Sequence, residues 1–409
     1  MRIKFALLAF ACAFSAAFAQ NPPAPAPAAA VIHSPEVSVD GKVTVRLNAP
    51  NAKEVIVSGF ADRLTVRKNL AMQKNDQGVW SVTTDTLTPD IYVYSFLVDG
   101  MRVNDPANPD IHTSFGNAGE SQVLVPGPNT WTPQPDVPRG ALTRHFYHSA
   151  VAGDEREFWV YTPAGYNPKR KEPYPVLYLL GGLGDRSDSW IAAGPANTIL
   201  DNLIAQGKAK PMLIVMPLGY GNSGGPAQAR SEGMLQAFTS TLIDEVMPQV
   251  EKVYNVSKDR NGRAIAGLSM GGAESTFVGL NHLDKFAWIG SFSGAYVMWP
   301  GAMPPAPTAV PVAAPAAGGE VRRPMNLDPA TISSIFPALH EKSNAQIRLL
   351  WIACGTEDRL VRVNRQFKDY LDSEKINVTY TEVPATAHVW PIWRENLTAL
   401  APLLFQDKK

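Results

Sequence analysis

The stretch RAIAGLSMGGAES, residues 263–275, decides the fold. Its first four residues read as a buried strand, and the residues after Ser269 read as a helix. Gly267 and Gly271 stand two residues before and after Ser269, where side chains would clash across a tight turn. This context favours a nucleophilic serine at the strand-to-helix elbow of an α/β-hydrolase fold, a mostly parallel sheet with helices on both faces.

The G-x-S-x-G pattern occurs a second time, at residues 221–225, which read GNSGG. The residues that follow, PAQARS, carry no helical pattern. We therefore interpret Ser223 as an ordinary loop serine. The flanking strand and helix, rather than the five-letter pattern, distinguish Ser269.

A serine nucleophile needs a base to take its proton. In α/β-hydrolases the acid and then the histidine follow the serine along the chain, which leaves His282, His340 and His388. His282 lies on the helix that Ser269 opens, about three and a half turns further on, and so points away. His340 lies in an amphipathic stretch that is typical of the surface. His388 follows the strand-like run 378–383 and is the predicted base.

The acid is expected where the strand-like run 349–353 ends in the loop CGTEDRL. Loops at the carboxyl ends of strands carry the chemistry of open α/β sheets. Asp358 is the predicted acid, with Glu357 as the alternative. Its role is to fix the tautomer of His388 and to stabilise the imidazolium.

Two main-chain N–H groups are expected to form the oxyanion hole. One belongs to Met270, directly after the serine. The other is expected in the glycine-rich loop 181–185, which follows a strand-like run and lets the backbone approach a substrate closely. Leu183 is the predicted donor, and Gly182 is the second choice.

Five segments carry a family resemblance: residues 179–183, 264–272, 284–288, 354–358 and 388–396. Together they resemble carbohydrate esterase family 1, whose members include feruloyl esterases and acetyl xylan esterases, with siderophore esterases and bacterial mycolyltransferases as relatives. The similarity runs over residues 140–405, and the tail WPIWREN after His388 is its most specific part. The family usually has His-Gly where this chain has Gly181-Gly182, so the oxyanion loop departs from the family pattern.

The resemblance implies a serine esterase that hydrolyses hydroxycinnamoyl (feruloyl) esters on plant cell-wall xylan or arabinoxylan through an acyl-enzyme. Plant cell-wall polysaccharide or oligosaccharide esters would be its partners, and no cofactor or metal is expected. Four tryptophans are candidates to flank the acyl group or sugar: Trp190, Trp299, Trp390 and Trp393. The alternatives are an acetyl xylan esterase, a siderophore esterase, a mycolyl-type transferase and a carbohydrate-binding protein with a degenerate site.

The chain begins with a pattern typical of a secretory signal peptide, residues 1–19. Two basic residues precede an apolar run, and Ala-Phe-Ala precedes Gln20. The apolar run is too short for a membrane span, and no later stretch reaches that length. A secreted or periplasmic protein is therefore expected, with a Pro/Ala-rich linker over 20–33.

Composition excludes some classes of partner and site. The chain has 37 basic and 37 acidic residues, so it offers no electrostatic footprint for nucleic acid. It has two cysteines, of which Cys12 leaves with the signal peptide. Cys354 is therefore expected to be a free, buried small side chain, and no zinc or iron site is expected.

Residues 34–128 show short alternating runs divided by turn residues, which is typical of an all-β sandwich. The region resembles the immunoglobulin-like early-set domain of family 48 carbohydrate-binding modules, including the hairpin turn at 98–100. Tyr92 and Phe96 are expected to fill the sandwich core. Whether Trp80 fills the core or offers its ring to a sugar stays open at this point.

A linker is expected over 129–139, followed by the esterase domain over 140–409. Within that domain strand-like and helical runs alternate, which indicates a mostly parallel sheet covered on both faces. Residues 300–324 are rich in Pro, Ala and Gly. We interpret them as a tolerated insertion, with a lid as the alternative.

Overall fold

The structure is a computed structural model that describes residues 32–114, 117–221, 225, 233–302 and 325–406. The predicted signal peptide, most of the linker over 20–33, Ser223 and nearly all of the insertion over 300–324 lie outside the described residues. Residues 33–409 form one structural unit, and every contact reported below lies within it.

The N-terminal sandwich consists of two antiparallel sheets, with strand orders β1-β2-β6-β5 and β4-β3-β7-β10-β9, and with β8 paired to β7. The strands are β1 Glu36–Val37, β2 Val43–Asn48, β3 Val55–Gly59, β4 Lys68–Ala71, β5 Gln73–Lys74, β6 Val79–Thr83, β7 Asp90–Val98, β8 Met101–Val103, β9 Ile111–Ser114 and β10 Asn117–Val125. The predicted all-β sandwich is confirmed.

Alternate side chains of these strands fill the sandwich core, because successive residues of a strand point to opposite faces. Tyr94 and Phe96 are fully buried there. Trp80 is also a core residue, and its Nε1 donates a hydrogen bond of 2.9 Å to the Ala49 carbonyl. The aromatic face of Trp80 is therefore used for packing, which decides the point that the sequence left open.

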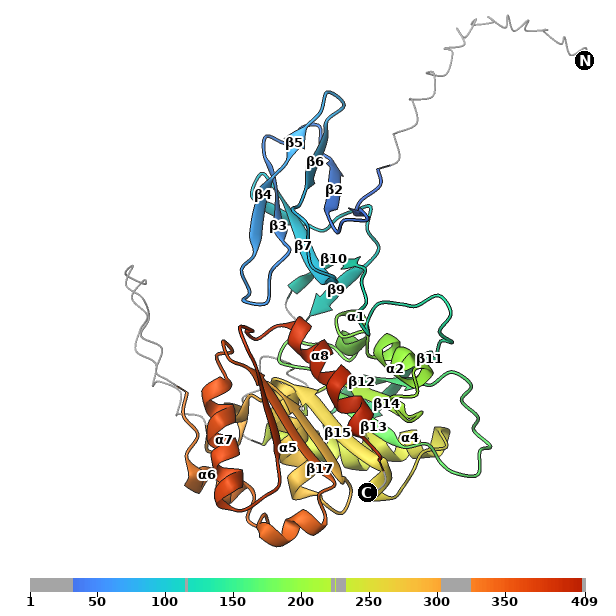
Figure 1. The fold of residues 1–409 in the computed structure, drawn as a ribbon, viewed down its shortest axis with the longest axis vertical. Coiled ribbons are helices and arrows are strands. Elements are labelled where there is room, and N and C mark those ends of the chain that lie inside the picture. The colour runs from blue at the N-terminus through green and yellow to red at the C-terminus, as the bar shows by residue number, and fades with distance from the viewer. Residues whose placement is uncertain (1–31, 115–116, 222–224, 226–232, 303–324, 407–409) are drawn as a thin grey trace, which may run out of the picture. The chain divides into compact units, whose positions relative to one another are not determined.

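The central sheet has eight strands in the order β11-β12-β14-β13-β15-β16-β17-β18 (Figure 1). The pairs β11–β12 and β12–β14 are antiparallel, and all the other pairs are parallel. Its strands are β11 Ala141–Ser149, β12 Asp154–Thr162, β13 Val176–Leu180, β14 Leu213–Pro217, β15 Arg263–Leu268, β16 Trp288–Phe292, β17 Leu349–Gly355 and β18 Thr379–Val383.

Eight α-helices are described between and after these strands: α1 Ser189–Ala192, α2 Ala196–Ala205, α3 Met234–Ser240, α4 Met247–Val253, α5 Met270–Asn281, α6 Pro329–Ile335, α7 Val361–Ser373 and α8 Trp390–Leu400. Helices α3 and α4 form one continuous helical stretch, joined by a π-helical turn at Thr241–Val246. None of the described helices is both long and apolar enough to cross a membrane.

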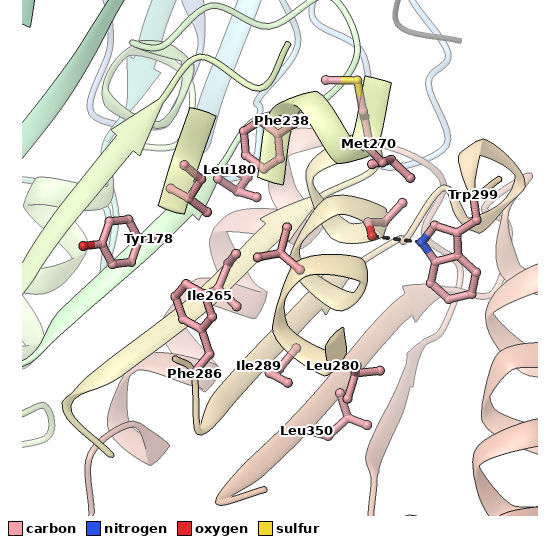
Figure 2. Close-up of a cluster of buried hydrophobic side chains, with 14 of the residues drawn as sticks. Tyr178, Leu180, Phe238, Ile265, Met270, Leu280, Phe286, Ile289, Trp299 and Leu350 are labelled. Carbon is pink, nitrogen blue, oxygen red and sulfur yellow. Dashed lines mark hydrogen bonds between the residues drawn. The ribbon is translucent and has the colours of Figure 1, made fainter. Parts of the chain in front are cut away.

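Two hydrophobic cores lie on opposite faces of the central sheet. On β13, Tyr178 and Leu180 belong to one core, while Leu177 and Leu179 belong to the other. The first core includes side chains of α3, α4, α5, α6 and α7, part of which is drawn in Figure 2. The second includes side chains of α2 and α8. Strand β13 is thus apolar on both sides, as a central strand between two helical layers requires, and the α/β-hydrolase prediction is confirmed.

Candidate active site

Ser269 sits in a strained turn between β15 and α5, with φ of 53° and ψ of −112°. A side chain at positive φ is costly, so the surroundings must enforce it. Two glycines make the close backbone approach at this turn possible, because a Cβ on Gly267 would collide with the Gly271 backbone and a Cβ on Gly271 would collide with the Gly181 carbonyl. The Ser269 N–H also donates to the Phe292 carbonyl at 2.8 Å.

His388 lies between Ser269 and Asp358. Its Nε2 is 3.0 Å from Ser269 Oγ, and its Nδ1 is 2.8 Å from Asp358 Oδ2. Asp358 follows β17 and His388 follows β18, so neighbouring parallel strands end at the same edge of the sheet. The three residues singled out by the sequence are thus brought together across 119 residues of chain.

Asp358 is buried, at 2 % exposure, and yet is held in its ionised form. Burial alone would raise the pKa of this carboxyl, but the hydrogen bond and charge of His388, with the Leu360 N–H, outweigh it and lower the pKa. An ionised acceptor at Nδ1 keeps the proton on that nitrogen and leaves Nε2 free to accept one from Ser269.

The alternative residues are placed elsewhere. Glu357 is exposed and contacts Thr356. His282 stands at the C-terminal end of α5. His340 begins a short 3₁₀ helix at Glu341–Ala345, where its side chain accepts from the Lys342 N–H. None of the three has a described contact with Ser269.

The loop after β13 is ordered by its own acidic residue. Asp185 Oδ2 accepts a hydrogen bond of 2.7 Å from the Gly182 N–H, and the Gly184 N–H donates to the Tyr220 hydroxyl at 2.5 Å. Gly182, the second choice for the oxyanion hole, therefore already has an acceptor. The Leu183 N–H has none among the described residues, and Leu183 and Ser269 line the same cavity.

Gly181, where the chain departs from the family pattern, packs closely against the side chains of Ser189 and Asp185. A Cβ there would meet Ser189 Oγ at 2.9 Å and Asp185 Cβ at 3.0 Å. Burial raises the pKa of Asp185 to about 6, although the Gly182 N–H and His388 pull it down. The sequence showed Asp185 in the loop without indicating that its side chain folds back onto the loop.

Arg63, from the N-terminal sandwich, holds the loop that carries His388. Its carbonyl accepts from the Ala387 N–H at 2.9 Å, and its Nε donates to Thr386 Oγ1 at 3.1 Å. Its two terminal nitrogens donate to both carboxylate oxygens of Glu395 on α8, at 2.5 and 2.8 Å. Sequence reasoning missed this residue, because nothing local links position 63 to position 388.

A cavity of about 390 Å³ opens beside Ser269 and His388. The esterase part of its wall includes Gly182, Leu183, Leu268, Val389, Trp390 and Trp393. The sandwich supplies the other part, which includes Ile91, Val93, His112, Glu120 and Gln122. The two parts of the chain therefore share one cavity.

Two of the four candidate tryptophans, Trp390 and Trp393, line this cavity. Trp190 and Trp299 do not: each is 1 % exposed and belongs to a hydrophobic core. Trp190 Nε1 donates to the Leu180 carbonyl at 2.9 Å. Trp299 Nε1 donates to the Ala273 carbonyl at 2.9 Å, a bond drawn in Figure 2. The substrate role predicted for these two residues is corrected to a packing role, because their rings are enclosed and their only polar atom is already bonded.

Comparison with known proteins identifies relatives of both parts of the chain. Residues 149–404 match the family model described as putative esterase. Residues 33–111 match carbohydrate-binding module 48, the isoamylase N-terminal domain. An endo-1,4-beta-xylanase/feruloyl esterase of Xylanibacter ruminicola is 30 % identical over 382 residues, which are 91 % of this chain and 46 % of that protein. The chain thus spans about half of that relative's length.

An acetyl esterase of Caldicellulosiruptor saccharolyticus is 26 % identical over 55 % of this chain and 80 % of its own length. Among solved structures, a ferulic acid esterase of Anaeromyces mucronatus aligns over 68 % of this chain and 96 % of its own, with a TM-score of 0.55 and 24 % identity. The enterobactin esterase of Shigella flexneri aligns over 88 % and 92 %, with a TM-score of 0.60 and 18 % identity. At these identities the two structures support the fold.

Proposed function

We propose that this chain, which belongs to the putative esterase family, is a carboxylic ester hydrolase that cleaves hydroxycinnamoyl (feruloyl) esters of plant cell-wall xylan or arabinoxylan. The reaction uses Ser269, His388 and Asp358 as a catalytic triad. The observation that carries the proposal is the position of His388, with one ring nitrogen 3.0 Å from Ser269 Oγ and the other 2.8 Å from Asp358.

In the first step Ser269 Oγ attacks the ester carbonyl carbon while His388 Nε2 takes the hydroxyl proton. The carbonyl π electrons move onto oxygen, and the Met270 and Leu183 N–H groups stabilise the resulting oxyanion. When the carbonyl re-forms, the bond to the sugar oxygen breaks, and His388 returns the proton to the leaving alcohol. The acyl group remains on Ser269.

In the second step water takes the place of the alcohol. His388 removes a proton from the water as it attacks the acyl carbon, and the same N–H groups hold the second oxyanion. Collapse breaks the bond to Ser269 Oγ, which recovers its proton from His388. Asp358 stays ionised throughout and stabilises the imidazolium of both steps.

The substrate class is supported by the Xylanibacter relative, whose name combines a xylanase with a feruloyl esterase. Trp390 and Trp393 both line the cavity. Trp393 is buried and donates from Nε1 to Ser293 Oγ, whereas Trp390 is half-buried, so an aromatic acyl group can pack against Trp390. The signal-like start of the chain fits a secreted or periplasmic enzyme that meets such polymers.

The test is a panel of esters assayed with wild type and Ser269→Ala. Wild type is expected to release ferulate from methyl ferulate and from feruloylated arabinoxylan fragments. The variant is expected to lose at least about a thousandfold in kcat, because only the oxyanion donors and binding remain. A variant that hydrolyses these esters as fast as wild type contradicts the assignment of Ser269.

An acetyl xylan esterase is the second candidate, since the acetyl esterase relative matches over 80 % of its length. The same panel of esters separates a feruloyl esterase from an acetyl xylan esterase, because faster release of acetate than of ferulate indicates an acetyl xylan esterase. A siderophore esterase is separated in the same way by a catecholate ester.

A further inference from the structure

One face of the sandwich sheet β7-β10-β9 forms part of the cavity wall. Directly opposite residues in antiparallel strands share a face, and so do residues i and i+2 of one strand. Gln122 is paired with Val93, and Glu120 is paired with His112. These four residues therefore lie on one face with Ile91, and all five line the cavity of Ser269. The other face carries Tyr94 and Val123 into the sandwich core.

Two polar atoms on this face have no hydrogen-bond partner in the part of the chain that the structure describes. Gln122 is 8 % exposed, and neither its Nε2 nor the Nε2 of His112 has a hydrogen-bond partner among the described residues, although both atoms are buried. Buried polar atoms of this kind cost free energy unless something completes their hydrogen bonds. Glu120 differs, because Arg67 and Arg102 both pair with its carboxylate.

A row of aromatic rings connects this face to the catalytic histidine. Ring centroids are 4.9 Å apart between His388 and Trp393, 5.2 Å between Trp393 and Trp390, and 6.2 Å between Trp390 and His112. Burial lowers the pKa of His112, so its imidazole is neutral and has one donor and one acceptor nitrogen. A neutral imidazole and a carboxamide suit uncharged hydroxyl groups, which both donate and accept.

We propose that His112 and Gln122 form a polar subsite that binds the hydroxyl groups of a ring of the substrate ester while its carbonyl lies at Ser269. The sandwich then acts as a wall of the active site. This inference rests on the proposed function and adds the residues that recognise the substrate. The ring is either the sugar of the alcohol part or the hydroxylated aryl ring of the acyl part.

The test compares three esters in wild type, His112→Ala and Gln122→Leu: methyl cinnamate, methyl ferulate and a feruloylated arabinoxylo-oligosaccharide. Loss of one neutral hydrogen bond corresponds to roughly a three- to tenfold rise in KM for the ester that uses the subsite. A rise already present for methyl ferulate, relative to methyl cinnamate, assigns the aryl hydroxyl. A rise confined to the oligosaccharide assigns the sugar.

Gln73→Leu and His148→Ala are the matched controls, because both residues are exposed and lie outside the cavity wall. They are expected to change no KM by more than about twofold. His112→Gln and Gln122→Glu keep polar atoms at the two positions and are expected to recover part of the loss. Equal losses on all three esters, or no loss on any of them, overturn the subsite.

A binding measurement separates this inference from the proposed function. Ser269→Ala is titrated with the feruloylated oligosaccharide, and binding is measured by isothermal titration calorimetry. Weaker binding after Gln122→Leu, with an unchanged melting temperature, supports the subsite even if wild type turns over only acetyl esters. Equal binding with and without Gln122→Leu overturns the subsite, whatever the turnover shows.

Discussion

At the scale of single residues, the site depends on glycines, which leave space for close contacts, as much as on its polar side chains. Gly267 and Gly271 leave room for the backbone to cross itself at Ser269. Gly181 leaves room for Asp185, which folds back and bonds the oxyanion loop through the Gly182 N–H. Asp185 thus orders the loop that presents Leu183, and it does so from a partly buried position that opposes its ionisation.

Removing the Asp185 acceptor should loosen the oxyanion loop. We expect Asp185→Ala to lower kcat by roughly ten- to a hundredfold with a smaller change in KM, because a misplaced donor stabilises the oxyanion poorly. Asp185→Asn keeps an acceptor for the Gly182 N–H and should retain most of the activity. Steady-state kinetics on methyl ferulate checks both variants, and an unimpaired Asp185→Ala enzyme contradicts the positioning role.

The raised pKa of Asp185, about 6 against an ordinary 3.8, also predicts a pH dependence of stability. The folded state holds this proton more tightly than the unfolded state, so the contribution is fully present below pH 4 and is lost as pH rises through 6. Asp185→Asn removes the loss. We compare the free energy of unfolding of Asp185→Asn with that of wild type at pH 4 and at pH 8. The difference, variant minus wild type, should be larger at pH 8 than at pH 4 by on the order of 2 kcal/mol. Denaturant titrations at the two pH values measure it, and a pH-independent difference contradicts the pKa.

At the scale of elements, the proposed catalytic residues stand on loops at the carboxyl ends of β15, β17 and β18, which lie close together in the parallel part of the sheet. The loop after β18 has a second support, since Arg63 binds Thr386, Ala387 and Glu395. A sandwich residue therefore fixes the backbone directly before His388.

Breaking that support should affect catalysis more than folding. We expect Arg63→Ala to lower kcat by roughly tenfold, because displacement of His388 from Ser269 Oγ weakens proton transfer. Arg46→Ala is the control, since Arg46 pairs with Glu36 and has no described contact with this loop. Kinetics and melting curves for both variants check the prediction. A fall in melting temperature without a fall in kcat assigns Arg63 a purely structural role.

At the scale of the whole molecule, the sequence predicted those features that depend on short stretches of residues, such as strands, helices and glycine turns. The strand, glycine turn and helix around Ser269 and the two strand ends that carry Asp358 and His388 lie where they were expected, and the sandwich and the parallel sheet are confirmed. The locations of the tryptophans were harder to predict, because a tryptophan in a core and one in a cavity wall both have apolar sequence neighbours. Trp299 proved to be core, whereas Trp390 lines the cavity.

Contacts between the sandwich and the esterase part were not predictable from one sequence. Arg63 meets a loop 323 residues away, and the buried ion pair of Arg394 with Asp90, at 2.6 Å, joins residues 304 apart. No periodicity or spacing encodes such pairs. They became apparent only in the structure, where the sandwich lines part of the cavity beside Ser269.

The central claim, that Ser269 becomes acylated in a step assisted by His388, is tested most directly by trapping the intermediate. Wild type is mixed with a hydroxycinnamate ester, quenched in acid within the first turnover, digested and analysed by mass spectrometry. The account predicts the acyl mass on the peptide that contains residues 263–275, and no such adduct in Ser269→Ala. An acyl group on another residue, or full turnover by Ser269→Ala, would contradict it.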